Sequence, residues 1–326
     1  MEAVNNIGTE NLNKAPTKKT LTEKKKKLLF YVIMFAPLLL QVAIFYIYVN
    51  VSNIGLAFTE YSRNPVTNAV QTEFVWFENF SFVINFLFAP ENAVMFIDTF
   101  IMYGVVLIIA MPVGIFFSYY IYKKFPFAEL FRVVLFFPQV LSAVAMTIIY
   151  KTLLNDVVML YTGIEDGLLG GYGSVTTYAM IILYTLWMSF GGNILLYCGA
   201  MSGINESIVE ACHLDGCGVV KEFIHVILPS IYPTIVTFVL IDICAIFTQN
   251  MNLYTFYGQN PLPKGINGSI GYFLVKQTAQ SDFIVGEGWY WNYSQLSALG
   301  LLITFVTLPV SLIVRHLMNK FGPSED

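Results

Sequence analysis

The chain has 326 residues, of which 56% are hydrophobic, 16% are aromatic and only 12% carry a formal charge. Soluble domains usually contain about 25% charged residues, so this composition excludes a soluble enzyme and a disordered protein. The net charge of −4 is small and the one basic cluster lies in a tail, which argues against a nucleic-acid partner. A surface that faces membrane lipid explains the composition best.

The first 27 residues are polar and basic and have no periodic apolar face. We expect residues 1–27 to form a disordered tail, and residues 321–326 to form a second, short one. Lysines at positions 24–27 precede the first apolar stretch directly. That stretch exceeds 20 residues and no small-residue cleavage site follows it, so it is typical of an uncleaved anchor rather than of a signal peptide.

Six apolar stretches are long enough to cross a membrane as helices. A helix rises about 1.5 Å per residue and the hydrocarbon core is about 30 Å thick, so one crossing needs roughly 20 residues. The sequence therefore predicts an all-α integral membrane protein with six transmembrane helices in one domain, residues 28–320. The six stretches cover about residues 28–49, 94–121, 133–154, 175–198, 231–256 and 296–314. Prolines within them predict kinks, at Pro37, Pro112, Pro138 and Pro309.

Lysine and arginine near the ends of the spans predict the orientation, because these residues stay on the cytoplasmic side. If the amino terminus lies inside, 13 of the 17 basic residues are cytoplasmic, although the tail supplies much of that excess. The other four, Arg63, Lys151, Lys264 and Lys276, lie outside. Six spans then place both termini in the cytoplasm.

The cytoplasmic loop between spans four and five, about residues 199–229, is too polar for the membrane and too patterned for a linker. Asn205 or Ser207 can cap a helix whose positive end lies near acidic residues. Asp215 and Gly216 then predict a tight turn. A second short helix follows, with apolar residues Val219, Val220, Phe223 and Val226, and ends at Leu228 and Pro229. The loop is therefore predicted to be helix, turn, helix.

This loop resembles the signature Glu-Ala-Ala, three residues, Gly, nine residues, Ile-x-Leu-Pro of the membrane subunits of bacterial ATP-binding-cassette importers. The matching residues are Glu210-Ala211-Cys212, Gly216 and the run from Val226 to Pro229, in which Cys212 replaces an alanine and Val226 an isoleucine. From about residue 125 to the carboxyl end, the chain is similar to the maltose-type, carbohydrate-transporting branch. It lacks the large extra outer domain of some maltose subunits, so the shorter multiple-sugar permeases are more similar to it.

The resemblance implies a transport subunit of the bacterial cytoplasmic membrane. Its partners would be a cytoplasmic ATPase dimer, a second homologous permease, an extracytoplasmic solute-binding protein and a sugar. By this likeness, Glu210 would pair with a basic group of the ATPase, Ala211 would allow close approach, and Asp215 and Gly216 would form the turn. The sequence has no G-x-x-x-x-G-K-[ST] loop, so we expect no cofactor and no enzymatic activity in this chain, and ATP and Mg²⁺ on the partner ATPase.

Polar side chains within the spans are candidates for substrate binding, because such groups are costly in hydrocarbon and usually face a cavity or a partner. Asp242 in span five is the clearest case. Carried over by position from the maltose-type family, the candidates are Gln139, Met188, Ser189, Asp242 and Gln249. The alternative is that these side chains bond neighbouring helices.

The four cysteines predict small buried or loop thiols rather than a disulfide framework. Cys212, His213 and Cys217 lack the second pair that a tetrahedral metal site needs. Other functions remain open at this point: an importer permease for an amino acid or a metal ion, a stand-alone channel or ion-driven carrier, and a membrane-embedded enzyme. The last has no H-E-x-x-H or G-x-S-x-G motif to support it.

Overall fold

The computed structural model describes residues 23–63, 69–163, 167–169, 174–263, 266–280 and 291–323. Of the two predicted tails, only residues 23–27 and 321–323 lie within these ranges. The chain divides into two compact units, Met1–Asn53 and Ile54–Asp326, and each is described by itself.

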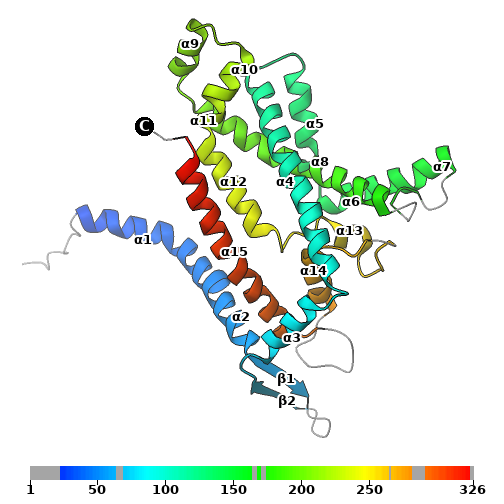
Figure 1. Ribbon diagram of the computed structural model, residues 1–326. Coiled ribbons are helices and arrows are strands. Elements are labelled where there is room, and N and C mark those ends of the chain that lie inside the picture. The colour runs from blue at the N-terminus through cyan, green and yellow to red at the C-terminus, as the bar shows by residue number, and fades with distance from the viewer. Residues whose placement is uncertain are drawn as a thin grey trace, which may run out of the picture. The chain divides into compact units, whose positions relative to one another are not determined.

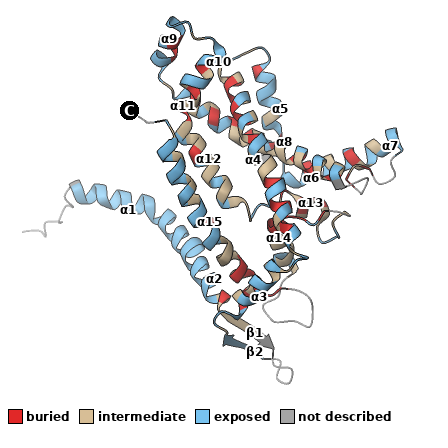
Figure 2. Ribbon diagram, in the orientation of Figure 1, coloured by how far each residue is buried: buried red, intermediate tan, exposed pale blue. Residues whose placement is uncertain are grey.

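The first unit contains a single helical segment, built from helix α1 (Glu23–Gln41), the π-helical segment η1 (Val42–Tyr48) and the start of α2 (Val49–Ala57). The predicted first span, residues 28–49, lies within this helix, which extends beyond it at both ends. Its large apolar side chains are exposed around the whole helix (Figure 2). Such a helix suits an environment of lipid, because lipid accepts apolar side chains on every face.

The second unit begins with an antiparallel hairpin of β1 (Thr59–Arg63) and β2 (Val70–Phe74), in which Thr59 lies opposite Phe74. Helix α3 (Glu78–Phe88) follows. The buried Asn79 amide donates hydrogen bonds to the carbonyl oxygens of Ala57 (3.0 Å) and Thr59 (3.1 Å), which fixes α3 to the start of the hairpin. The segment between the first two predicted spans is therefore folded in its described parts.

The remaining elements of the second unit are helical (Figure 1). Helices α4 and α8 pack along each other, α5 packs on α8, and α15 packs on α3 and α12. In chain order the elements are α4 (Ala93–Tyr122), α5 (Ala128–Val140), α6 (Ala143–Thr152), η2 (Leu153–Val157), α7 (Val158–Thr162), α8 (Ser174–Ser202), α9 (Glu206–Leu214), α10 (Val219–Glu222), η3 (Phe223–Ile227), α11 (Leu228–Ser230), α12 (Tyr232–Ala245), α13 (Leu253–Tyr257), α14 (Ile270–Gln280) and α15 (Tyr293–Phe321).

Two of the six predicted spans are broken. The third, residues 133–154, is interrupted between α5 and α6, where Leu141 has an extended backbone. The fifth, residues 231–256, ends as a helix at Ala245. Pro138 precedes the first of these breaks, whereas Pro112 and Pro309 lie within continuous helices.

The described residues contain five helices long and apolar enough to cross a membrane, or six if a bent pair counts as one span. That pair consists of Val219–Ser230 and Tyr232–Ala245, which meet at an angle of 65°. The 14 residues of α12 reach about 21 Å, so α12 by itself is shorter than the hydrocarbon core. The prediction of an all-α membrane protein is confirmed.

Buried side chains in the second unit gather in three clusters, seen as red segments in Figure 2. The largest joins α4, α6, α8, α13 and α14, and contains Tyr184 and Phe256. A second lies where α3 meets α15, around Leu299 and Trp291. The third joins α4, α8 and the residues before α12, and contains Tyr197 and Ile227. This third cluster fixes the base from which α9 and its turn extend.

Candidate functional site

The first part of the signature, from Glu210 to Gly216, lies in α9 and the turn after it, residues 205–218, which we call the α9 loop, and residues 226–229 of the signature lie in η3 and α11. Its helix begins where the sequence predicts: the Asn205 side-chain oxygen accepts a hydrogen bond from the Ser207 backbone N–H at 3.1 Å. This cap satisfies one of the amide groups that a helix start leaves unpaired. Figure 1 shows the loop at one end of the second unit, next to α10.

The end of α9 is a Schellman turn. The Cys217 N–H donates to the Cys212 carbonyl (2.9 Å), and the Gly216 N–H donates to the His213 carbonyl (3.0 Å), which is the bonding pattern of that motif. Gly216 has φ +76°, a left-handed conformation that residues with a Cβ rarely adopt. The predicted helix, turn, helix is therefore confirmed, with glycine at the position that requires it.

Cys212 and Cys217 form a disulfide across this turn, with their Cα atoms 5.3 Å apart. A Schellman turn brings these two positions together, where an apolar contact is common. The expectation that both would be simple thiols was therefore wrong, because the local backbone pairs them. Cys198 and Cys244 are free. Among the described residues, no group of three His, Cys, Asp or Glu side chains could hold a metal ion.

The α9 loop presents one buried and one exposed face. Val209 and Cys212 are the buried residues of α9. The four residues predicted to couple this chain to an ATPase are all exposed: Glu210, Ala211, Asp215 and Gly216.

Two large apolar side chains lie on the exposed part of the same helix: Ile208 is 50% exposed and Leu214 is 89% exposed. The Glu210 carboxylate has neither a hydrogen bond nor an ion pair within the part of the chain that the structure describes. The exposed face therefore combines an unpaired carboxylate with apolar surface.

A buried carboxylate connects this loop to the helix body. Glu222 in α10 is 1% exposed, and Lys123 at the end of α4 binds both of its oxygens, at 2.9 and 3.0 Å. The His213 Nε2 atom of α9 lies 2.7 Å from the Glu222 Oε2 atom. Burial by itself would raise the pKa of Glu222, but the hydrogen bonds from Lys123 and His213 outweigh burial and lower this pKa. Glu222 was not among the predicted functional residues.

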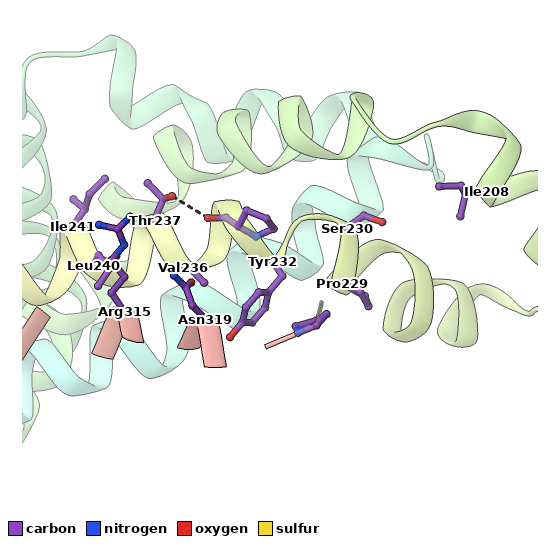
Figure 3. A pocket seen from close by; sticks show the side chains of 12 residues that line it. Ile208, Pro229, Ser230, Tyr232, Val236, Thr237, Leu240, Ile241, Arg315 and Asn319 are labelled. Atoms are coloured by element: carbon purple, nitrogen blue, oxygen red, sulfur yellow. Dashed lines mark hydrogen bonds between the residues drawn. The ribbon is translucent and has the colours of Figure 1, made fainter. Parts of the chain in front are cut away.

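A hollow of about 970 Å³ lies beside the α9 loop, between α12 and α15 (Figure 3). Arg315 and Asn319 of α15 line it opposite residues of α12, and Ile208 lies at its far end in Figure 3. The Thr237 hydroxyl in this hollow donates to the Pro233 carbonyl of its own helix at 2.9 Å. The hydrogen-bond donor of the Thr237 hydroxyl is therefore already paired within α12.

A smaller cavity of about 50 Å³ lies between α4, α8 and α12. The predicted residues Ser189 and Asp242 both line it, together with Asn193 and two residues that the sequence analysis missed, Tyr103 and Tyr197. The Tyr103 hydroxyl is buried and has no hydrogen-bond partner among the described residues. Carboxylate, amide and hydroxyl groups here can bond water or the hydroxyls of a solute.

The other three predicted substrate residues lie elsewhere. The Gln139 side-chain amide donates to the Met188 carbonyl at 2.6 Å, which joins α5 to α8. Gln249 lies in the turn after α12, where its carbonyl accepts a hydrogen bond from the Ser269 hydroxyl at 3.1 Å. The cavity therefore brings together two of the five residues, and the substrate-binding role of all five stays a prediction.

Comparison with known proteins identifies the class. Residues 110–324 match the family of binding-protein-dependent transport system inner membrane components, and the chain belongs to this family. It is thus a multi-pass permease subunit of a transport system in the bacterial inner membrane.

Individual relatives are also transport system permeases. Over 225 residues the chain is 26% identical to the arabinooligosaccharides transport system permease protein AraP of Bacillus subtilis, covering 66% of this chain and 68% of the relative. Over 299 residues it is 22% identical to AraP of Halalkalibacterium halodurans, covering 89% and 87%. A chain of a bacterial ABC transporter that imports the acidic polysaccharide alginate has the same fold, with a TM-score of 0.68, 17% identity, and coverage of 91% of this chain and 97% of that one.

Proposed function

We propose that this chain is the membrane-spanning subunit of an ATP-binding-cassette importer that carries a sugar or oligosaccharide into the cytoplasm. The observation that carries the proposal is the exposed signature face of α9, which combines Glu210, Ala211 and the turn at Gly216. A separate cytoplasmic ATPase dimer would bind this face and supply the energy. Both chain termini and the α9 loop would then lie on the cytoplasmic side.

The sugar assignment rests on the relatives and on the chemistry of the small cavity. AraP relatives are permeases for arabinooligosaccharides. Ser189, Asn193 and Asp242 offer donors and acceptors for hydroxyl groups, and tyrosine rings offer apolar faces for a sugar ring.

The cavity of this chain can form only part of a sugar site. Its volume of about 50 Å³ suits a few water molecules, whereas sites for small organic ligands usually have about 300–1,000 Å³. A second homologous permease would complete the site. An extracytoplasmic solute-binding protein would deliver the sugar to it.

Transport would follow alternating access. ATP would close the ATPase dimer, α9 would move with it, and the spans would change between inward-facing and outward-facing states. The ATPase and the sugar site then bias one conformational equilibrium.

Co-purification of the ATPase with matched variants tests the ATPase contact. Glu210→Lys should greatly reduce retention of the ATPase, whereas Glu206→Lys makes the same charge change on an exposed residue in the first turn of the same helix and should retain it. Equal retention in both variants would contradict the proposal.

Uptake of a panel of labelled oligosaccharides by vesicles that contain the whole complex tests the cargo. We expect ATP-dependent accumulation of at least one sugar. Asp242→Ala should abolish or alter that accumulation without loss of assembly, whereas Thr304→Val, which removes a hydroxyl bonded within α15, should leave it unchanged. Accumulation of none of the sugars, or unchanged selectivity in Asp242→Ala, would contradict the sugar site.

A further inference from the structure

The α9 loop is attached to the rest of the second unit by apolar packing and by a contact with the buried Glu222. Only Val209 and Cys212 of α9 are buried, so little apolar surface attaches this helix to the rest of the unit. The contact between the His213 ring and the Glu222 carboxylate, at 2.7 Å, is its polar attachment.

Glu222 is in turn bound to the end of α4. The Lys123 ammonium group donates to both carboxylate oxygens of Glu222, and these two bonds fix the position of the Glu222 side chain relative to the end of α4. One turn earlier in α4, the Tyr119 hydroxyl donates to the Val219 carbonyl at 3.1 Å. The Tyr119 ring also contacts the Phe223 ring, with centroids 4.8 Å apart. Two successive turns of α4 therefore hold α10.

A buried carboxylate that loses its partners is strongly destabilised. The contacts of Glu222 therefore favour one arrangement of α9, α10 and α4 over others, and a displacement of α9 acts on α4 through Glu222.

The opposite end of α4 makes a second buried polar connection. Helix α4 has 30 residues and is therefore about 45 Å long. Near its start, the Asp98 Oδ2 atom accepts a hydrogen bond from the Asn267 N–H at 3.1 Å, and the Thr99 Oγ1 atom accepts one from the Ile270 N–H at 3.0 Å. Asp98 is 7% exposed and Thr99 is 1% exposed. These bonds attach the first residue of α14 and the segment before it to α4.

We propose that Glu222 is a positioning residue that transmits displacement of α9 to α4, and that α4 carries this displacement to α14 at its other end. Figure 1 shows α9 and α10 near one end of α4 and α14 beside its opposite half. The proposal rests on the proposed function, because a partner ATPase must move α9. The proposed path is a continuous chain of contacts that begins at α9, passes through Glu222 and α4, and ends at α14.

The test uses the complete complex in vesicles, with the second permease, the ATPase dimer and the solute-binding protein. ATPase retention, ATP hydrolysis and sugar uptake are measured together. The decisive quantity is the ratio of sugar molecules imported to ATP molecules hydrolysed. In Glu222→Gln we expect the ATPase to be retained and this ratio to fall about tenfold, within the range of coupling factors typical of linked sites.

A double-mutant cycle separates transmission from simple destabilisation. Lys123→Met and Asp98→Ala should each lower the ratio, and neither should lower it much further when combined with Glu222→Gln, because all three interrupt one path. Thr147→Val is the control. It removes the buried hydrogen bond between the Thr147 and Tyr184 hydroxyls (2.7 Å), which joins α6 to α8 outside this path, and it should leave the ratio unchanged.

A wild-type ratio in Glu222→Gln, or fully additive effects of Glu222→Gln and Asp98→Ala, would overturn the proposal and leave the proposed function intact. If Glu222→Gln does not assemble, His213→Ala takes its place, since that side chain is 49% exposed and a wild-type ratio there would overturn the proposal equally. Failure of the unchanged complex to import any sugar with ATP would contradict the proposed function instead.

Discussion

Gly216 shows how one residue decides the form of the α9 loop. Its φ of +76° is unfavourable for other residues, although a Cβ there would meet no atom within 4 Å. Gly216→Ala should therefore cost about 1 kcal/mol of local stability through backbone strain alone. Weaker ATPase retention should accompany this loss.

Gly218 provides a matched control two residues later. A Cβ there also meets nothing within 4 Å, and its φ of −77° suits any residue. Gly218→Ala should therefore retain the ATPase as the wild type does, and co-purification measures the difference. Equal loss in both variants would show that side-chain bulk, not backbone conformation, matters in this loop.

The ion pair of Glu222 should make the stability of the folded protein depend on pH in a definite direction. Burial raises its pKa, but the Lys123 and His213 hydrogen bonds lower it more, so the folded pKa lies below the unfolded value of about 4.3. Its contribution to stability is then present above about pH 4.3 and is lost as the pH falls through the folded pKa. Removing one partner of such a buried pair costs roughly 3 kcal/mol.

Thermal unfolding of the purified protein in detergent tests this sign. Glu222→Gln should unfold at a lower temperature than the wild type at about pH 5 and above, and the difference should shrink below about pH 4. Glu206→Gln, an exposed change in α9, should show no such trend. A difference that grows as the solution becomes more acidic would contradict the ion pair.

Residue-level predictions from the sequence succeeded where the signal is local. Asn205 and Gly216 follow from capping and turn preferences, and the structure confirms both. Glu222 and Lys123 are 99 residues apart, so no local pattern indicates that they pair. The Cys212–Cys217 pair was missed because only the Schellman backbone brings them together.

At the scale of elements, the α9 loop is closed by this disulfide. It encloses six residues, for which the chain-entropy estimate of stabilisation is about 2 kcal/mol. The cytoplasmic side proposed for this loop keeps thiols reduced, so the test uses protein purified without reductant and oxidised in air. We then expect thiol-labelling reagents to modify Cys212 and Cys217 only after a reductant has been added, with mass spectrometry as the measurement. Labelling of both in unreduced, folded protein would contradict the pairing.

The helix breaks show where element-level prediction reaches its limit. Apolar length predicts that a span exists, but close packing decides where it bends. A Cβ at Gly191 in α8 would lie 3.0 Å from the Leu135 carbonyl and would also collide with the Gln139 side chain, so α5 approaches α8 closely just before its break. A Cβ at Gly271 in α14 would collide with the Gln249 backbone, which lies in the turn where α12 has ended.

At the scale of the whole molecule, the composition and the spacing of apolar stretches were sufficient for the fold class and for most of the spans. The sugar path was less predictable, because its residues converge from α4, α8 and α12, and only Ser189 and Asp242 of the five candidates share a cavity. That small cavity also fits an importer in which two permeases each contribute part of the path. The proposed transport would therefore depend on assembly with partner subunits, above all with an ATPase.

The most direct test of that dependence is site-specific crosslinking within the assembled complex. A photo-reactive amino acid at Leu214, which is 89% exposed on α9, should crosslink to the ATPase subunit. The same group at Thr72, exposed on the β2 strand of the hairpin, should not. Crosslinks to the ATPase from Leu214 alone are the predicted result. Crosslinks from both positions equally, or from Thr72 alone, would contradict the assignment of α9 as the surface through which this permease is driven.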